Sequence, residues 1–187
     1  MIAAIKDIMV FVYKFTRSPK YVGSVSPSSI FLAKKMVGSI PWGQVSTVAE
    51  LGAGTGAITK YLDKVIKPNT KVILFEKDDD LRNKLAQRYS DYSIYKDAGN
   101  LKKSIMLEGV EQLDCIISGL PFFNFRQSMR EQLLEEIVSA LRPGGLFITF
   151  QYSQQMKRQL SQYFNIEHID WVSLNIPPAF VYVCRKV

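Results

Sequence analysis

The stretch with the clearest chemical content is T-V-A-E-L-G-A-G-T-G, from Thr47 to Gly56. A short apolar and β-branched run ends at Glu50, and glycines follow at alternate positions, Gly52, Gly54 and Gly56. Glycine lets the polar groups of a ligand approach the main chain, because no side chain intervenes. The third glycine comes one residue earlier than in the G-x-G-x-x-G pattern of dinucleotide sites. With no pyrophosphate to bind, a carboxylate at Glu50 would suit a nearby ammonium group.

Three later strand-like segments also end in polar groups, at Glu76, at Asp97 and at the Ser118-Gly119 pair. The carboxyl ends of parallel strands meet at one edge of an open sheet, where ligands bind. A carboxylate at Glu76 can accept both ribose hydroxyls, and Asp97 with the amide that follows it can contact an adenine edge. Each acid alone would equally suit a solvated loop or a helix cap. Together they predict a pocket for an adenosine with a positively charged amino-acid tail, and S-adenosylmethionine fits that description.

Strand-like and helix-like segments alternate from residue 45 onward, which predicts an α/β fold with a mostly parallel sheet covered on both faces. Strands are expected at 45–51, 71–76, 92–96, 113–118, 146–152, 166–174 and 180–185. Helices are expected at 56–65, 78–89, 126–141 and 153–163. The last two strands are joined by the short N-I-P-P-A turn, so they should pair as a hairpin with one antiparallel strand at the end of the sheet.

The first 43 residues precede this alternating pattern. Residues 2–16 place apolar side chains on one helical arc and charged ones on the opposite arc, which predicts an amphipathic helix. A proline-containing loop follows, and Ser26 or Ser28 can cap a second helix that ends near Val37. The amphipathic helix either lies in a lipid interface or packs as ordinary core. We expect one domain over residues 1–187, with this extension at 1–43 and a cofactor-binding core at 44–187.

The charge of the chain favours an anionic partner. The 187 residues carry a net charge of +7. Residues 1–49 alone hold six basic residues against Asp7, a net charge of +5. Nucleic acid, an anionic membrane surface and an acidic ligand all fit this distribution.

The remaining composition bears on the compartment and on metals. Cys115 and Cys184 lie in apolar strand-like runs, which predicts buried thiols in a reduced compartment. There is no C-x-x-C pair and His168 is the only histidine, so we expect no metal and a structural or exposed role for His168. No apolar run is long enough to span a membrane. The sequence predicts a cytoplasmic protein that becomes peripheral on the inner face of the cell membrane if its basic part binds lipid.

The motifs E-L-G-A-G-T-G, F-E-K, D-A and S-G-L-P-F together resemble those of class I S-adenosylmethionine-dependent methyltransferases, over about residues 45–187. The resemblance implies a Rossmann-like seven-stranded sheet, an antiparallel last strand and S-adenosyl-L-methionine as cofactor. It assigns cofactor binding to the following residues: Glu50, Gly52, Ala53, Gly54, Gly56, Glu76, Lys77, Asp97, Ala98 and Ser118.

Two subfamilies compete for the acceptor. The ribosomal RNA adenine dimethylases have N-L-P-Y or N-I-P-Y after the fourth strand, whereas this chain has Gly119 where they have asparagine. The S-G-L-P-F form, the V-G-S-V-S-P-S-S segment from Val22 and the I-T-F-Q-Y-S segment from Ile148 resemble bacterial phospholipid N-methyltransferases, which methylate phosphatidylethanolamine. We therefore expect methylation of a phospholipid amine at an anionic membrane surface. RNA adenine N6-methylation, a small soluble amine acceptor and a non-catalytic cofactor-binding protein that docks on a membrane remain alternatives.

Methyl transfer to an amine suggests roles for residues around the acceptor. The carbonyl of Ser118 or Gly119 would accept an amine N–H and aim the lone pair, and Tyr21 would bind the lipid phosphate or close over the cofactor. The residues expected at the substrate are Tyr21, Ser24, Leu120, Pro121, Phe122 and Tyr152. For Phe122, acyl or amine contact, base stacking and plain packing stay open.

Overall fold

The computed structural model describes residues 29–187 and contains one seven-stranded sheet. The expected helix at 2–16, Tyr21 and Ser24 lie outside the described residues. The strands are β1 Thr47–Leu51, β2 Lys71–Phe75, β3 Ser93–Tyr95, β4 Leu113–Ser118, β5 Leu141–Gln151, β6 Asn165–Val172 and β7 Ala179–Arg185. Their order in the sheet is β3-β2-β1-β4-β5-β7-β6.

The first five strands are parallel, and β7 runs antiparallel to both of its neighbours. The expected mostly parallel sheet with an antiparallel last strand is therefore confirmed. The expectation that this strand lies at the end of the sheet is wrong, because β7 lies between β5 and β6 and the edge strand is β6. The short turn permits this order, since it forces β6 and β7 to pair and leaves the other side of β7 for β5.

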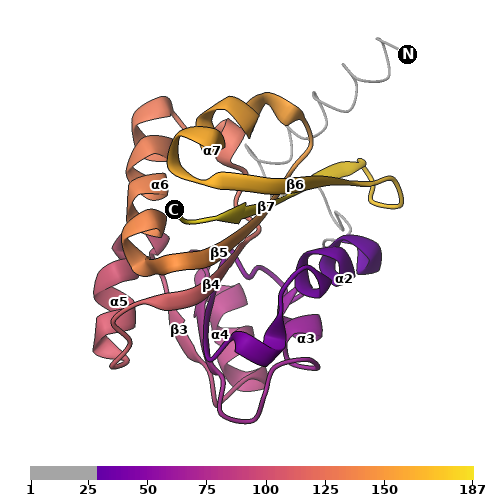
Figure 1. The fold of residues 1–187 in the computed structure, drawn as a ribbon. Helices are drawn as coiled ribbons and strands as arrows, with labels where there is room; N and C mark the ends of the chain where they lie inside the picture. The colour runs from indigo at the N-terminus through magenta and orange to yellow at the C-terminus, as the bar shows by residue number, and fades with distance from the viewer. Residues whose placement is uncertain (1–28) are drawn as a thin grey trace.

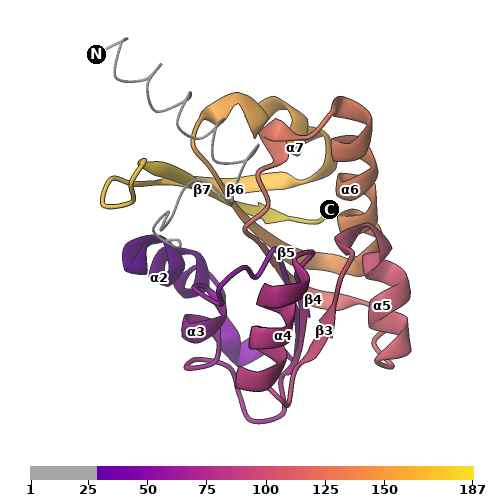
Figure 2. The ribbon, with the colours of Figure 1, turned by 180° about the vertical axis from the view of Figure 1, so that it is seen from behind.

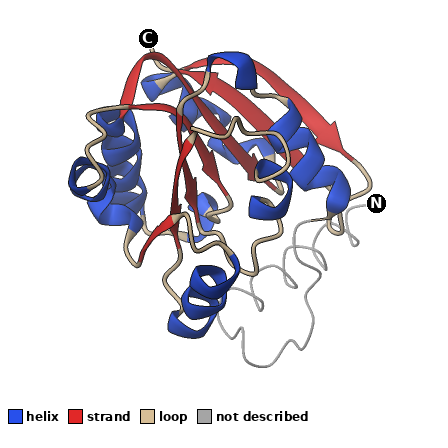
Figure 3. Cartoon of the chain, turned by 90° about the horizontal axis from the view of Figure 1, so that it is seen from below, coloured by secondary structure: helices blue, strands red, loops and turns tan. Residues whose placement is uncertain are grey.

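Helices cover both faces of the sheet (Figures 1 and 2), and Figure 3 shows the strands between them. Side chains alternate across a strand, so each face of the sheet contributes its own apolar cluster. One cluster packs β1, β2 and β4 against three helices, α2 Ile30–Gly38, α3 Thr59–Leu62 and α4 Asp79–Arg88. The other packs the opposite face against α5 Leu101–Leu107, α6 Gln127–Ala140 and α7 Lys157–Tyr163.

Several element boundaries differ from those expected. The helix α3 is short because Gly56 has φ +81°, a conformation that no α-helix contains. The strand β5 begins at Leu141 rather than 146, because Gly144 and Gly145 exchange main-chain hydrogen bonds with Lys186. The helix α5 was not expected. The cap of α2 is Ser29 rather than Ser26 or Ser28, since the Ser29 hydroxyl accepts the amide of Leu32 at 3.2 Å.

The strand register places the turn of the last hairpin at the same edge as the glycine loop. The carboxyl end of β5 pairs with the start of β7, with Gln151 opposite Phe180. The end of β6 pairs with the same point, with Val172 opposite Ala179. Residues 173–178 therefore project from the edge where β1, β2 and β4 end. We call it the carboxyl edge, and the opposite edge the amino edge.

Candidate active site at the carboxyl edge

The glycine loop after β1 has the conformation that its spacing predicts. Gly52, Gly54 and Gly56 all have positive φ, at +76°, +56° and +81°, which residues with a side chain rarely adopt. The amides of Gly52 and Ala53 donate to the carbonyl of Phe75 at the end of β2, at 2.8 and 3.0 Å. A Cβ on Gly54 would meet no atom within 4 Å, so the main chain there is open to a ligand.

Glu50 is a fully buried carboxyl group at the end of β1. Its Oε2 accepts a hydrogen bond from the Thr59 hydroxyl at 2.8 Å, whereas its buried Oε1 has no hydrogen-bond partner. Burial raises the pKa of Glu50 to about 8, although the hydrogen bonds from Thr59 oppose the shift. An orphaned oxygen on a buried acid provides the place that an ammonium group would fill.

Glu76 joins the end of β2 to the glycine loop. Its Oε2 accepts the amide of Gly54 at 2.7 Å, and its Oε1 accepts the amide of Asp78 at 2.9 Å. The structure thus brings Glu76 to the same loop that Glu50 precedes, as the spacing of strand ends predicts. Each carboxylate oxygen has a second lone pair with which to bind a hydroxyl.

Asp97 is occupied by its own turn after β3. Its Oδ1 accepts the amide of Gly99 at 2.9 Å, and its Oδ2 accepts the side-chain amide of Asn100 at 2.7 Å. These bonds are those of a cap, which was one of the alternatives for a strand-end acid. Lys77 is exposed and Ala98 is partly buried beside the second cluster. The contact of Asp97 with adenine stays a prediction.

The loop after β4 packs its main chain against the glycine loop. The amide of Gly119 donates to the carbonyl of Leu51 at 2.9 Å, and a Cβ at position 119 would lie 3.1 Å from the carbonyl oxygen of Gly52. Glycine at 119 therefore allows this close approach. Ser118 is buried, its hydroxyl accepts the amide of Leu120 at 3.2 Å, and its carbonyl accepts the Thr149 hydroxyl at 3.4 Å. In residues 29–187 no donor reaches the carbonyl of Gly119.

The residues expected at the substrate separate into exposed and buried ones. Phe122 is fully buried and packs edge-on against Phe125 and Phe147, as in the packing alternative, and its contact with substrate stays a prediction. The next residue, Phe123, is half exposed instead. Tyr152 is partly exposed just after β5. Leu120 lies directly over the loop, with a methyl carbon 2.9 Å from the position of a Cβ on Gly52, and Pro121 follows it.

Three side chains near this edge were not anticipated from the sequence. Thr59 supplies the hydroxyl partner of Glu50. Gln151, almost fully buried at the end of β5, donates its amide to the carbonyl of Leu120 at 3.2 Å. The Tyr89 hydroxyl is buried without a partner, and its ring lies 3.5 Å from the position of a Cβ on Gly56. For Thr59, the only signal in the sequence is a hydroxyl in a helix-like segment nine residues after Glu50, and that signal does not by itself predict the contact.

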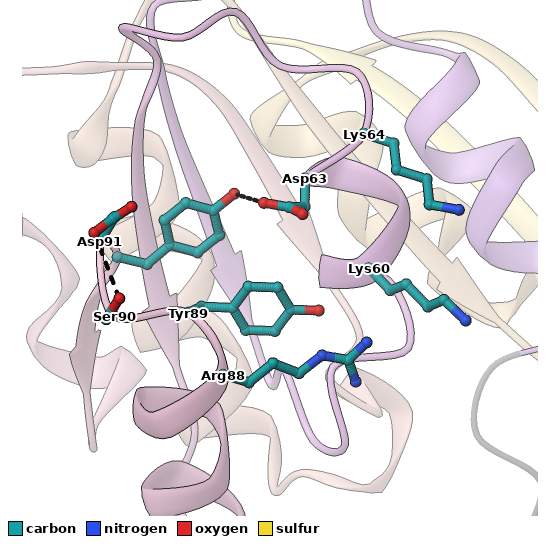
Figure 4. A pocket seen from close by; sticks show the side chains of 8 residues that line it. Lys60, Asp63, Lys64, Arg88, Tyr89, Ser90 and Asp91 are labelled. Carbon is teal, nitrogen blue, oxygen red and sulfur yellow. Dashed lines mark hydrogen bonds between the residues drawn. The ribbon is translucent and has the colours of Figure 1, made fainter.

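A hollow of about 310 Å³ lies on the flank of the molecule between α3 and α4 (Figure 4). The rings of Tyr89 and Tyr92 stack in it with centroids 5.4 Å apart, and the Tyr92 hydroxyl donates to Asp63 at 2.5 Å. Lys60 and Arg88 extend past these rings in Figure 4. Asp91 and Tyr92 precede β3, so this part of the hollow lies toward the amino edge, whereas the ring of Tyr89 reaches Gly56 of the glycine loop.

The glycine loop, the orphaned oxygen of Glu50 and the carboxylate of Glu76 fit a cofactor with an amino-acid tail and a ribose. Among residues 29–187, no group of three or more potential metal ligands is found, and no helix there has the length and apolar character to span a bilayer. The sheet order and this site define a class I S-adenosylmethionine-dependent methyltransferase.

Comparison with known proteins agrees with this class. Residues 48–145 match the family described as methyltransferase domain, and the chain belongs to that family. The ornithine lipid N-methyltransferase of Singulisphaera acidiphila is 32% identical over 190 residues, which is 97% of each chain.

Solved structures share the fold. The N-methyltransferase NodS from Bradyrhizobium japonicum, in complex with S-adenosyl-l-homocysteine, superposes with a TM-score of 0.64 at 14% identity, over 84% of this chain and 88% of NodS. TrmN from Thermus thermophilus superposes with a TM-score of 0.65 at 17% identity over 83% of this chain, which spans only 48% of TrmN.

Proposed function

We propose that this enzyme transfers a methyl group to the primary amine of a membrane-lipid headgroup. The observation that carries the proposal is the 32% identity, over 97% of both chains, to an ornithine lipid N-methyltransferase. Phosphatidylethanolamine is the acceptor that we propose, because the S-G-L-P-F motif resembles that of enzymes acting on it. Ornithine lipid is the second candidate, because the matched relative acts on it.

The residues at the carboxyl edge have distinct roles in this proposal. The cofactor supplies an activated methyl group on a sulfonium. Glu50 binds the ammonium of its amino-acid tail through the orphaned Oε1, and Glu76 binds the ribose hydroxyls. Asp97 and the amide after it contact the adenine edge. Positioning of donor and acceptor, together with exclusion of water, provides most of the rate.

The acceptor amine must lose a proton before it can attack. An alkyl ammonium has a pKa of about 10, like that of lysine, and desolvation beside a cation lowers it. Gly119 offers the carbonyl that we propose for the amine N–H, since the carbonyl of Ser118 already accepts from Thr149 and that of Leu120 from Gln151. This contact would aim the nitrogen lone pair at the methyl group.

The proposal is tested by incubating the enzyme with labelled methyl donor and one acceptor at a time. The acceptors are vesicles containing phosphatidylethanolamine, vesicles containing ornithine lipid, ribosomal RNA, and a water-soluble amine. Label in either lipid supports the proposal and identifies the acceptor. Label confined to RNA or to the soluble amine, or no label at all, contradicts it.

A further inference from the structure

Exposed apolar side chains are concentrated at one end of the molecule. Of the twelve large hydrophobic residues exposed in residues 29–187, eight lie at or beside the carboxyl edge. These eight are Ile30, Phe31, Phe123, Met129, Tyr152, Trp171, Leu174 and Ile176. Scattered exposed hydrophobic residues need no explanation, whereas a group gathered at one edge marks an interaction surface. The edge is the one that contains the proposed active site.

Four members, among them the two most exposed, lie on the tip of the last hairpin and on the first turn of α2. Leu174 is 61% exposed and Ile176 is 84% exposed, whereas Asn175 between them is 3% exposed. Ile30 and Phe31 are 56% and 52% exposed. We call these four apolar residues the tip surface. Figures 1 and 2 both show the hairpin turn beyond the end of the sheet and next to α2.

Hydrogen bonds fix the tip surface in place. The buried Asn175 accepts the amide of Ser29 at 3.0 Å and donates to the carbonyl of Pro177 at 2.7 Å. The inward amide turns the two flanking side chains outward and ties the turn to the start of α2. Leu174 and Ile176 are therefore held outward by a hydrogen-bonded turn. Apolar side chains fixed in this way at a tip are suited to insertion into a bilayer.

The charges next to the tip surface suit an anionic bilayer. Lys34 and Lys35 are exposed one turn along α2, about 6 Å further from the tip than Ile30. Side chains inserted below the headgroups would bring these lysines to the level of the lipid phosphates. Lys35 also forms an ion pair with Asp170 of β6 at 3.0 Å, which keeps helix and hairpin together.

We infer that the tip surface inserts into an anionic lipid bilayer and so turns the carboxyl edge toward the membrane. The inference rests on the proposed function, because a lipid amine is reached only by a site that faces the headgroups. It explains why the exposed apolar residues and the strand ends share one edge. It also places docking on the folded core, in addition to any contribution from residues 1–28.

The test compares two double variants of the full chain. The first variant, Leu174→Ser with Ile176→Ser, removes the two apolar side chains at the tip of the hairpin. The control variant, Met106→Ser with Leu107→Ser, removes comparable exposed apolar area at the end of α5, on the amino edge. Binding is measured by flotation with vesicles of phosphatidylcholine and phosphatidylglycerol, which contain no primary amine. We expect the hairpin variant to bind at least about tenfold more weakly and the α5 variant to bind like the wild type. Matching thermal unfolding midpoints check that both variants fold.

Equal binding of the hairpin variant and the wild type overturns the inference, whether the tip surface is then covered by residues 1–28 or by a second copy of the chain. Equal losses in both variants, or no flotation of the wild type, also overturn it. The vesicles lack an acceptor, so docking is measured apart from methylation. Flotation that depends on the hairpin, combined with no methylation of any lipid, would contradict the proposed function alone.

Discussion

Glu50 is the residue whose environment departs furthest from that expected of a surface acid. In the fold its pKa rises from 4.5 to about 8, because burial disfavours the ionised form. Between these two values the native state holds a proton that the unfolded chain releases. The contribution of Glu50 to the free energy of unfolding should therefore fall as pH rises from 4.5 to about 8, by at most about 1.4 kcal/mol per pH unit.

Glu50→Gln removes this titration and keeps the hydrogen bond with Thr59. Denaturant unfolding at several pH values should show the wild type losing stability relative to this variant as pH rises. Parallel curves for the two proteins would contradict the raised pKa. Calorimetry in buffers of different ionisation enthalpy should also detect a proton released by the wild type when the cofactor binds near pH 7, and none by the variant.

Glu76 tests the ribose contact. Hydrogen bonds to a charged group contribute about 1.5–3 kcal/mol each, so Glu76→Ala should weaken cofactor binding by at least about a hundredfold in calorimetry. Glu76→Gln can still accept from the Gly54 amide, so its cofactor affinity should lie between those of the wild type and Glu76→Ala. Asp80→Ala, an exposed acid on α4, serves as the control. Unaltered affinity in Glu76→Ala would remove this residue from the ribose role.

Residues of the site were predictable from the sequence where the chemistry is local and not where it depends on distant contacts. The positions of Glu50 and Glu76 follow from strand ends and glycine spacing. The roles of Gln151 and Asn175 depend on partners 31 and 146 residues away, so no local pattern contains them. The packing of Phe122 depends in the same way on a distant partner, since Phe147 belongs to the strand β5.

At the scale of elements, alternation of strands and helices predicted all seven strands, whereas local conformation set their ends. Gly56 delays α3, and Gly144 lets β5 begin early, because main-chain geometry at single glycines is not visible in hydrophobic periodicity. The helix α5 was missed because it is only seven residues long and amphipathic patterns need several turns. The short turn predicted that β7 pairs antiparallel with β6, but it did not predict that β7 also pairs with β5.

The end of β5 positions the loop after β4 through the hydrogen bond from the Gln151 side chain to the carbonyl of Leu120. Gln151→Leu has a similar volume but cannot donate to the carbonyl of Leu120, which should free the loop that presents Gly119. We expect the rate of methyl transfer to fall about tenfold or more, with cofactor affinity in calorimetry nearly unchanged. Gln154→Leu, an exposed neighbour, is the matched control. A parallel loss of cofactor affinity would show that Gln151 supports the cofactor loop as well.

At the scale of the whole molecule, the sheet separates chemistry from stability. The order of the strands reverses between β1 and β4, and both strands end at the proposed active site. The amino edge instead contains an acid whose hydrogen bonds join three strands. Asp114 accepts the amides of Ser46 and Thr47 at 2.8 and 3.0 Å and the Arg142 guanidinium at 2.6 Å. Burial opposes ionisation there, but these bonds hold the pKa of Asp114 below 3.8.

Asp114→Ala should therefore lower the free energy of unfolding by about 2–3 kcal/mol at neutral pH, with cofactor affinity unaltered. A lowered pKa contributes stability that is present above 3.8 and lost as pH falls through the native pKa, so the difference between variant and wild type should shrink in acid. Glu111→Ala, an exposed acid on the same edge, should change stability by less than about 0.5 kcal/mol. Weaker cofactor binding by Asp114→Ala, measured where both variant and wild type are fully folded, would contradict this separation of chemistry from stability. It would show that the amino edge is coupled to the active site across the sheet.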